Sequence, residues 1–348
     1  MNKSFYQRCY KPIQIQMAKL EITQKCNSRC KTCSTWQIQD STLSRGESIQ
    51  SELKGAEYLQ VLEELKLLGC KYVEIHGGEP TLYKDLPLIV NKCAELGIAT
   101  MITTNGLSMT GEIAQNLIDF RISRINYSLD GPRECHNLLR GRDNAFDKMM
   151  AAMGMIREAD QKKIVYKNIN TMVSSKNIER IEEVVEIAFE NKIDIITFVH
   201  PSIANEEVIT AVNQIFGEPV ASHRIVCQDE FLITDLALIE EKREAIKSEA
   251  KKFGVRVDKT NFFTFPAAEI AKGIKRHPKP CWDIYGNIVI DAGGNVVPCE
   301  LLRFKLGNVK ENSLTDILSS ERFEEFSKIY CRNIDDISIC ACCVESVY

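Results

Sequence analysis

Short apolar runs alternate with longer amphipathic stretches from Ala18 to about Pro201. The short runs are rich in β-branched residues, and the longer ones repeat apolar residues at helical spacing, so the pattern predicts βα units around a parallel sheet. The predicted strands are 18–23, 71–76, 98–103, 122–129, 163–172 and 194–200. The predicted helices are 51–69, 85–97, 110–120, 143–159 and 177–191.

Small, hydroxyl or amide side chains follow most of these strands. Because right-handed crossovers place the C-terminal ends of parallel strands at one rim, we expect these residues to form one polar mouth over an apolar barrel. The segments concerned are 77–80, 103–106, 128–132, 168–171 and 199–201. The rim is therefore the predicted binding site.

The rest of the chain has a different pattern. Helical periodicity covers 234–253, whereas 203–230 supports no assignment. Residues 281–299 predict a hairpin that turns at a Gly-Gly pair, and a helix follows near 313–330. We therefore expect an N-terminal extension, a barrel, a partly helical bridging segment and a small cysteine-rich domain, with the bounds 1–17, 18–201, 202–279 and 280–348.

Composition narrows the class of protein. The chain has 348 residues, of which 44% are hydrophobic and 26% charged, so it can form a large domain and a smaller one. A net charge of −4, with only short and separated lysine-rich patches, argues against a nucleic-acid partner. No apolar stretch is long enough to span a membrane and no signal peptide is evident, so we expect a cytoplasmic location without a membrane partner.

Three cysteines lie within eight residues, in the run Cys26-Asn-Ser-Arg-Cys30-Lys-Thr-Cys33. In a cytosolic chain, fourteen cysteines indicate metal or cluster ligands rather than disulfides. Three thiolates can hold three irons of a cubane cluster and leave the fourth open to a small molecule. The alternatives are a zinc site with a distant fourth ligand, or unrelated buried thiols.

A second motif, the turn Gly77-Gly78-Glu79-Pro80, ends the next predicted strand. Together with the cysteine run it resembles the radical S-adenosylmethionine (radical SAM) superfamily. The resemblance implies a partial (β/α)6 TIM-like barrel, a four-iron cluster on Cys26, Cys30 and Cys33, and SAM bound at the open iron. It also implies that backbone around this turn binds the SAM amino group. One departure is Thr32, where the family usually has an aromatic residue.

Further contacts to SAM are expected at the rim. By resemblance, the candidates for its ribose or carboxylate are Thr104, Asn105, Ser128 and Asn170, although turn chemistry also accounts for such residues. Arg140 and Arg142 could pair with a carboxylate of SAM or substrate, or be solvated loop charges.

Three residues are candidates for direct participation in the reaction. His200 lies at a strand end and is a candidate for substrate contact or proton transfer, the alternative being a satisfied loop histidine. If the reaction is an epimerisation, a thiol must return a hydrogen atom, and Cys135 or Cys227 is the candidate.

A second cysteine set lies at the C-terminal end of the sequence. Its spacing resembles the SPASM or twitch extension of the same superfamily, and because the sequence ends five residues after Cys343 we expect the shorter, one-cluster twitch form. The implied ligands of an auxiliary four-iron cluster are Cys281, Cys299, Cys340 and Cys343, with Cys331 or Cys342 as possible replacements. A zinc ribbon is the alternative, because a C-x2-C pair with a hairpin also suits tetrahedral zinc.

The resemblance implies a reaction class. Reductive cleavage of SAM would give a 5′-deoxyadenosyl radical that takes a hydrogen atom from the substrate, and an auxiliary cluster favours oxidation, crosslinking or epimerisation of a peptide or small natural product. The implied reducing partner is a flavodoxin or ferredoxin. Two alternatives stay open, namely a dehydrogenase or epimerase of a sugar or cyclitol, and a non-catalytic iron–sulfur or zinc-binding scaffold.

Overall fold

The described residues form one ten-stranded sheet. The computed structural model describes residues 14–33, 36, 51–200, 206–220, 229–272, 281 and 283–341. The strand order is β10-β9-β8-β1-β2-β3-β4-β5-β6-β7. Strands β8 and β1 to β7 are parallel, and β9 pairs antiparallel with both β8 and β10. The strands are β1 (Met17–Thr23), β2 (Tyr72–Gly77), β3 (Ala99–Thr104), β4 (Arg124–Ser128), β5 (Tyr166–Met172), β6 (Ile195–Val199), β7 (Arg256–Val257), β8 (Asn287–Ile290), β9 (Asn295–Val297) and β10 (Gly307–Asn308).

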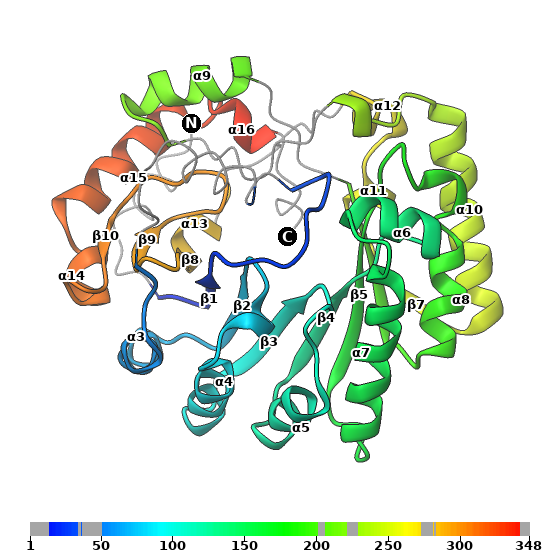
Figure 1. Cartoon of the computed structure of the whole chain (residues 1–348). Helices are drawn as coiled ribbons and strands as arrows, with labels where there is room; N and C mark the ends of the chain where they lie inside the picture. The colour runs from blue at the N-terminus through cyan, green and yellow to red at the C-terminus, as the bar shows by residue number, and fades with distance from the viewer. Residues whose placement is uncertain are drawn as a thin grey trace.

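Helices connect consecutive strands and cover the outside of the curved sheet (Figure 1). The longer ones are α3 (Gly55–Leu67), α4 (Leu86–Glu95), α5 (Gly111–Asp119), α6 (Arg133–Arg140), α7 (Ala145–Ala159), α8 (Glu183–Glu190), α9 (Glu206–Phe216), α10 (Leu236–Phe253) and α15 (Glu321–Asn333). The short ones are η1 (Pro80–Leu82), η2 (Ile178–Arg180), η4 (Asp229–Phe231), α11 (Asn261–Thr264), α12 (Ala267–Ile270), α13 (Asp283–Gly286), α14 (Leu314–Leu318) and α16 (Ser338–Ala341). This parallel, open barrel confirms the predicted fold class.

The inner face of the barrel differs from the prediction. Along β1, Ala18, Leu20 and Ile22 are buried in the core shared with the helices, and the alternate positions Lys19 and Glu21 lie on the other face. The inner positions of the neighbouring strands are also polar or charged in large part. The expectation of an apolar barrel was therefore wrong, because the apolar half of the strand pattern belongs to the helix-covered face.

Two of the longer helices, α6 and α9, were not predicted from the sequence. Helix α6 is short and mostly polar, and it ends at Gly141 in the left-handed conformation (φ +63°). Helix α9 lies in the segment that supported no assignment, and Phe216 near its end stacks on Phe326 of α15 with ring centroids 6.0 Å apart. Both helices depend on contacts with segments distant in sequence, which local periodicity does not report.

The C-terminal segment extends the barrel sheet directly. The predicted hairpin is confirmed as β8 and β9, although α13 replaces the first part of its expected first strand. Strand β8 pairs in parallel with β1, from Met17 opposite Asn287 to Leu20 opposite Ile290. The C-terminal cysteine segment is thus attached beside the strand that leads into the cysteine run. Among the described residues, every helix is too short or too polar to cross a bilayer.

Candidate functional site

The cysteine run forms the loop that follows β1. We call residues 24–33 the cysteine loop. Cys26, Cys30 and Cys33 are all partly exposed. Cys33 N donates to Cys30 O (3.2 Å), and the Trp36 indole donates to the same carbonyl (3.0 Å). Burial raises the pKa of the Cys26 thiol to about 11, so its thiolate needs a bound cation to be stable there.

The turn after β2 packs against the backbone of this loop. Gly77 has φ +135°, and a Cβ on it would lie 2.4 Å from Thr23 O. A Cβ on Gly78 would lie 2.1 Å from Lys25 O. The Gly78 and Glu79 N–H groups donate to Thr23 O (2.7 Å) and Lys25 O (2.8 Å). Only glycine allows this approach, so the turn and the cysteine loop form one unit.

Glu79 ties this unit to β3. Its carboxylate is 1% exposed and accepts hydrogen bonds from the Thr81 hydroxyl (2.6 Å), the Thr104 hydroxyl (2.7 Å) and Asn105 N (2.8 Å). Burial raises the pKa of Glu79, and these donors oppose that shift. Pro80 begins η1 directly after it. The hydroxyl of Thr104 is therefore directed at Glu79.

The remaining predicted rim residues lie close by on adjacent strands. The Asn105 amide donates to Asn27 Oδ1 (3.0 Å) and lies 3.8 Å from Cys26 Sγ. Ser128 ends β4 opposite Asn170 of β5, and both are half-buried. The structure thus brings Asn105 against the cysteine loop and places the other two at neighbouring strand ends.

The two arginines have different environments. Arg140 Nε lies 2.7 Å from Asp130 Oδ2, and Arg140 Nη1 lies 3.7 Å from Cys30 Sγ. Arg142 is exposed, and its Nε donates to Asn27 O (2.9 Å). Arg140 is thus a mostly buried, paired charge rather than a solvated one.

Two of the three candidates for direct participation, His200 and Cys135, lie among the described residues. His200 is 1% exposed and its backbone N donates to Asn261 Oδ1 (3.1 Å). Cys135 is half-buried on α6, and burial raises the pKa of its thiol. Cys227 lies outside the described residues.

His136 gives this region a pH-dependent stability. Its ring is fully buried and accepts a hydrogen bond from Asp130 N at Nδ1 (3.2 Å). Burial, and secondly the charge of Arg140, lowers the pKa of His136 to about 2. An unfolded histidine binds a proton below about pH 6.5, so the unfolded state binds more protons and stability falls as the pH falls.

We therefore expect the free energy of unfolding to fall by about 2 kcal/mol between pH 7.5 and pH 5 because of His136. The measurement is urea unfolding at both pH values for the wild type and His136→Asn, whose amide oxygen can still accept from Asp130 N. The variant should lose correspondingly less stability on acidification. Equal losses in the two proteins would show that His136 is protonated in the folded state.

A chain of polar contacts crosses the inner face of five adjacent strands. The Thr103 hydroxyl donates to Glu74 Oε1 (3.4 Å), and the Asn126 amide donates to Thr103 Oγ1 (3.2 Å). The Asn168 amide group lies 3.2 Å from Asn126 Oδ1 and 3.0 Å from Thr197 Oγ1. We call these five residues the polar ladder. It lies on β2 to β6. The sequence analysis placed Thr103 and Asn168 in the predicted rim segments, and it did not single out Glu74, Asn126 or Thr197.

A charged corner joins the polar ladder to the C-terminal segment. Lys19 Nζ lies 2.7 Å from Glu300 Oε2, and His76 Nε2 lies 3.4 Å from Glu300 Oε1. Arg303 donates from both Nη atoms to Glu21, at 2.7 and 3.0 Å. Ligand atoms of Glu21, His76 and Glu300 lie within 4.8 Å of one another, but the cations of Lys19 and Arg303 already balance both carboxylates.

Three of the described C-terminal cysteines act electrostatically on one buried tyrosine, Tyr330. Burial raises the pKa of Tyr330 above its usual value, and the nearby Cys340, Cys281 and Cys299 raise it further. Leu301 N donates to Cys299 Sγ (3.4 Å). The predicted replacement Cys331 is buried with its Sγ 3.2 Å from the Tyr285 hydroxyl. The other two cysteines of the predicted set, Cys342 and Cys343, lie outside the described residues.

Comparisons with known proteins agree with this arrangement. The Fe-coproporphyrin III synthase of Methanosarcina barkeri is 29% identical over 179 residues, which make up 51% of this chain and 42% of that protein. The AdoMet-dependent heme synthase of the same organism is 27% identical over 89% of this chain and 83% of its own length. The PqqA peptide cyclase of Methylocella silvestris is 23% identical over 88% of this chain and 74% of its own.

A solved structure shows the same fold, and family profiles show the family. Streptococcus suis SuiB bound to S-adenosylmethionine has a TM-score of 0.65 and 18% identity, covering 91% of this chain and 68% of SuiB. The profile of the Radical SAM superfamily matches residues 20–215, and that of SPASM, an iron–sulfur cluster-binding domain, matches residues 281–344. The chain therefore belongs to the radical SAM superfamily, and its cofactors are SAM, a SAM-binding four-iron cluster and an auxiliary iron–sulfur cluster in a C-terminal SPASM segment.

Proposed function

We propose that this protein is a radical SAM enzyme that oxidises, crosslinks or epimerises a peptide held inside the barrel. The SAM-binding cluster would be held by Cys26, Cys30 and Cys33, and the auxiliary cluster by Cys281, Cys299, Cys340 and Cys343. When bound, the reduced cluster and SAM supply a 5′-deoxyadenosyl radical that removes a hydrogen atom from the substrate.

The donor atoms present fit these groups. Three thiols on one loop leave one iron of a cubane cluster without a protein ligand. The two-glycine turn lies against that loop, where a Cβ at either glycine would collide with backbone oxygen. The thiols of Cys281, Cys299 and Cys340, from three separate segments, all raise the pKa of the same residue, Tyr330, which supports a second cluster in the C-terminal segment.

This chain's own residues have three roles in the proposal. The turn at Gly77 and Gly78 presents backbone to SAM beside the open iron, and Glu79 holds that turn and the end of β3 in fixed geometry. Asn105 orients the cysteine loop through Asn27. The polar ladder would position the substrate for hydrogen removal.

The polar ladder is the observation that carries the choice of a peptide. Its amide and hydroxyl groups both donate and accept hydrogen bonds, as a peptide backbone does. A tetrapyrrole would instead bring an apolar ring and several carboxylates, and two of the inner cations, Lys19 and Arg303, are already paired with Glu300 and Glu21. Similarity to a PqqA peptide cyclase over 88% of the chain supports the same choice, whereas the higher identity to an AdoMet-dependent heme synthase, 27% over 89% of the chain, favours a tetrapyrrole. The test therefore includes iron coproporphyrin III. A sugar or cyclitol would also suit a hydroxyl-rich surface, so the test includes small substrates.

The experiment separates SAM cleavage from substrate modification. Anaerobically reconstituted protein should contain about eight iron and eight sulfide, the sum of two four-iron clusters. With SAM and dithionite it should release 5′-deoxyadenosine, which a non-catalytic scaffold would not do. The substrates are synthetic peptides with the sequences of short peptides encoded next to this protein's gene. An oxidised or crosslinked peptide should lose two hydrogens, and an epimerised peptide should incorporate deuterium when the reaction is run in heavy water. Modification of iron coproporphyrin III or of a sugar, with the peptides unchanged, would overturn the peptide assignment.

A variant of the polar ladder tests the binding surface itself. Replacing Asn126 with leucine removes contacts to Thr103 and Asn168, so we expect peptide modification to fall at least tenfold while SAM cleavage without substrate stays near the wild-type rate. The control is Gln115→Leu, which removes an exposed amide on α5 that bonds only to Asp119 among the contacts described. Equal rates of modification in the two variants would contradict substrate binding at the ladder.

A further inference from the structure

Arg140 places a charged N–H group against a sulfur of the cysteine loop. Its side chain is 16% exposed, and Nη1 lies 3.7 Å from Cys30 Sγ. We propose that Arg140 is a positioning residue that raises the reduction potential of the cluster held by the cysteine loop. The inference rests on the proposed role of Cys30 as a cluster ligand.

The end of α6 is docked on the cysteine loop. Lys31 N donates to Leu139 O (2.8 Å), and the Ser28 hydroxyl donates to Arg140 O (2.7 Å). A Cβ on Gly141, which has φ +63°, would lie 2.5 Å from Arg29 O, so the helix end and the loop touch through backbone. The position of Arg140 relative to Cys30 is therefore set by main-chain contacts.

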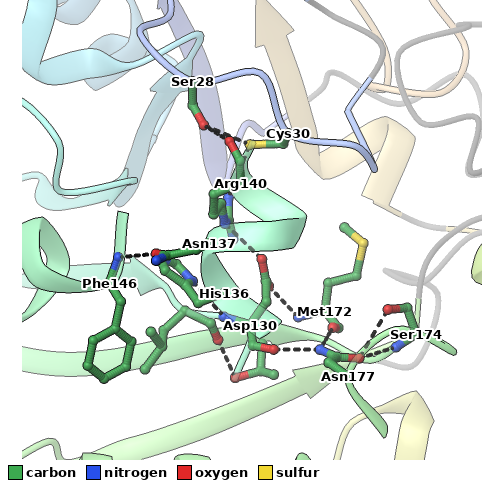
Figure 2. A network of polar contacts seen from close by, with 12 residues as sticks. Ser28, Cys30, Asp130, His136, Asn137, Arg140, Phe146, Met172, Ser174 and Asn177 are labelled. Carbon is green, nitrogen blue, oxygen red and sulfur yellow. Dashed lines mark hydrogen bonds and ion pairs between the residues drawn. The ribbon is translucent and has the colours of Figure 1, made fainter. Parts of the chain in front are cut away.

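Asp130 holds the guanidinium group in place from the other side (Figure 2). Its side chain is 4% exposed, lies 2.7 Å from Arg140 Nε and accepts from Met172 N (3.1 Å). Asn177 donates to Asp130 O (2.7 Å) and so fixes the backbone of the same residue. With Nε paired to Asp130, the Nη1 end of the fork is directed at Cys30.

The physical consequence concerns electron entry. Reducing the cluster adds one negative charge to a group whose ligands are already anionic. A cationic N–H donor at a ligand sulfur stabilises the reduced form more than the oxidised form, which raises the potential. The Ser28 hydroxyl lies 3.2 Å from the same sulfur, but its hydrogen is donated to Arg140 O, so the donor to this sulfur is the Arg140 N–H group. Asp130 partly offsets the positive charge, but it faces away from the sulfur.

The test compares two arginines on either side of Gly141 at the end of α6. Arg140→Gln removes the charge that contacts Cys30, and Arg142→Gln removes an equal charge that contacts only the Asn27 carbonyl among the contacts described. Redox titration of the reconstituted full chain is followed by electron paramagnetic resonance, with the SAM-binding cluster identified as the one whose signal changes on adding SAM. We expect Arg140→Gln to lower the ratio of reduced to oxidised cluster at fixed potential about tenfold, a shift of about 59 mV for one electron. Arg142→Gln should match the wild type.

The outcomes separate this inference from the proposed function. If SAM changes no signal of the wild type, the proposed function fails. If SAM changes that signal and Arg140→Gln keeps the wild-type potential with full iron content, only the role of Arg140 is overturned. Should Arg140→Gln not retain iron, Arg140→Lys is titrated instead. It keeps a charge without the fork, and we expect a smaller shift in the same direction, whereas an unchanged or raised potential would refute the inference.

Discussion

Replacing Gly78 with alanine is expected to reduce release of 5′-deoxyadenosine from SAM at least a hundredfold. The added Cβ would lie 2.1 Å from Lys25 O and 2.6 Å from Lys25 C, and both are backbone atoms that no side-chain rotation can move. The turn must therefore shift away from the cysteine loop. A displacement of about 1 Å in a reacting site costs on the order of 10²-fold in rate. The measurement is chromatographic detection of 5′-deoxyadenosine under reducing, anaerobic conditions.

Gly111→Ala is the matched control for this change. Gly111 is the first residue of α5, and a Cβ added there meets no atom within 4 Å. Alanine at this position should leave SAM cleavage unchanged and stabilise the protein by up to about 1 kcal/mol, because it restricts the unfolded chain. If Gly78→Ala keeps its iron content and still cleaves SAM at the wild-type rate, the turn does not need to contact the loop.

Glu21→Gln is expected to destabilise the protein by about 3–5 kcal/mol, because it leaves a mostly buried guanidinium group without its anion. Arg303 donates to both carboxylate oxygens of Glu21, and the two side chains are 15% and 7% exposed. Asp291 lies 3.6 Å from the same guanidinium and can replace only part of the interaction. The loss is measured by urea unfolding of the reconstituted protein, and iron content reports on the C-terminal segment.

A double variant and an exposed pair complete this test. Glu21→Leu combined with Arg303→Met removes both charges, and we expect it to recover much of the stability lost in Glu21→Gln. Glu244→Gln breaks an exposed pair with Lys247 on α10, for which the expected change is below about 1 kcal/mol. If Glu21→Gln and Glu244→Gln cost the same, the pair does not attach the C-terminal segment to the barrel.

The cysteine loop and the two-glycine turn were recognisable in the sequence because each is a local motif. Cys26, Cys30 and Cys33 lie on one short segment, and Gly77 and Gly78 lie on another. Their chemistry depends on residue type and spacing alone, so no distant contact was needed to identify them. The contact between the two motifs also followed from the expectation that parallel strands end at one rim.

The inner surface of the barrel could not be derived in the same way. The polar ladder combines single residues from five strands, and each of them looks like an ordinary polar position within its own strand. Arg303 and Glu21 are separated by 282 residues. The sequence analysis proposed Arg140 as a partner for a carboxylate of SAM or substrate. Its position beside Cys30 depends on how α6 docks on the cysteine loop.

Local spacing and residue type were enough to predict the alternating strands and helices, the thiol-rich loop and the family. Packing between distant segments was needed to establish which polar residues share the inner face, how β8 joins β1, and which charge lies against the cysteine loop. These features come from contacts between segments far apart in the chain, and the periodicity of one segment carries no information about the residues that face it from another.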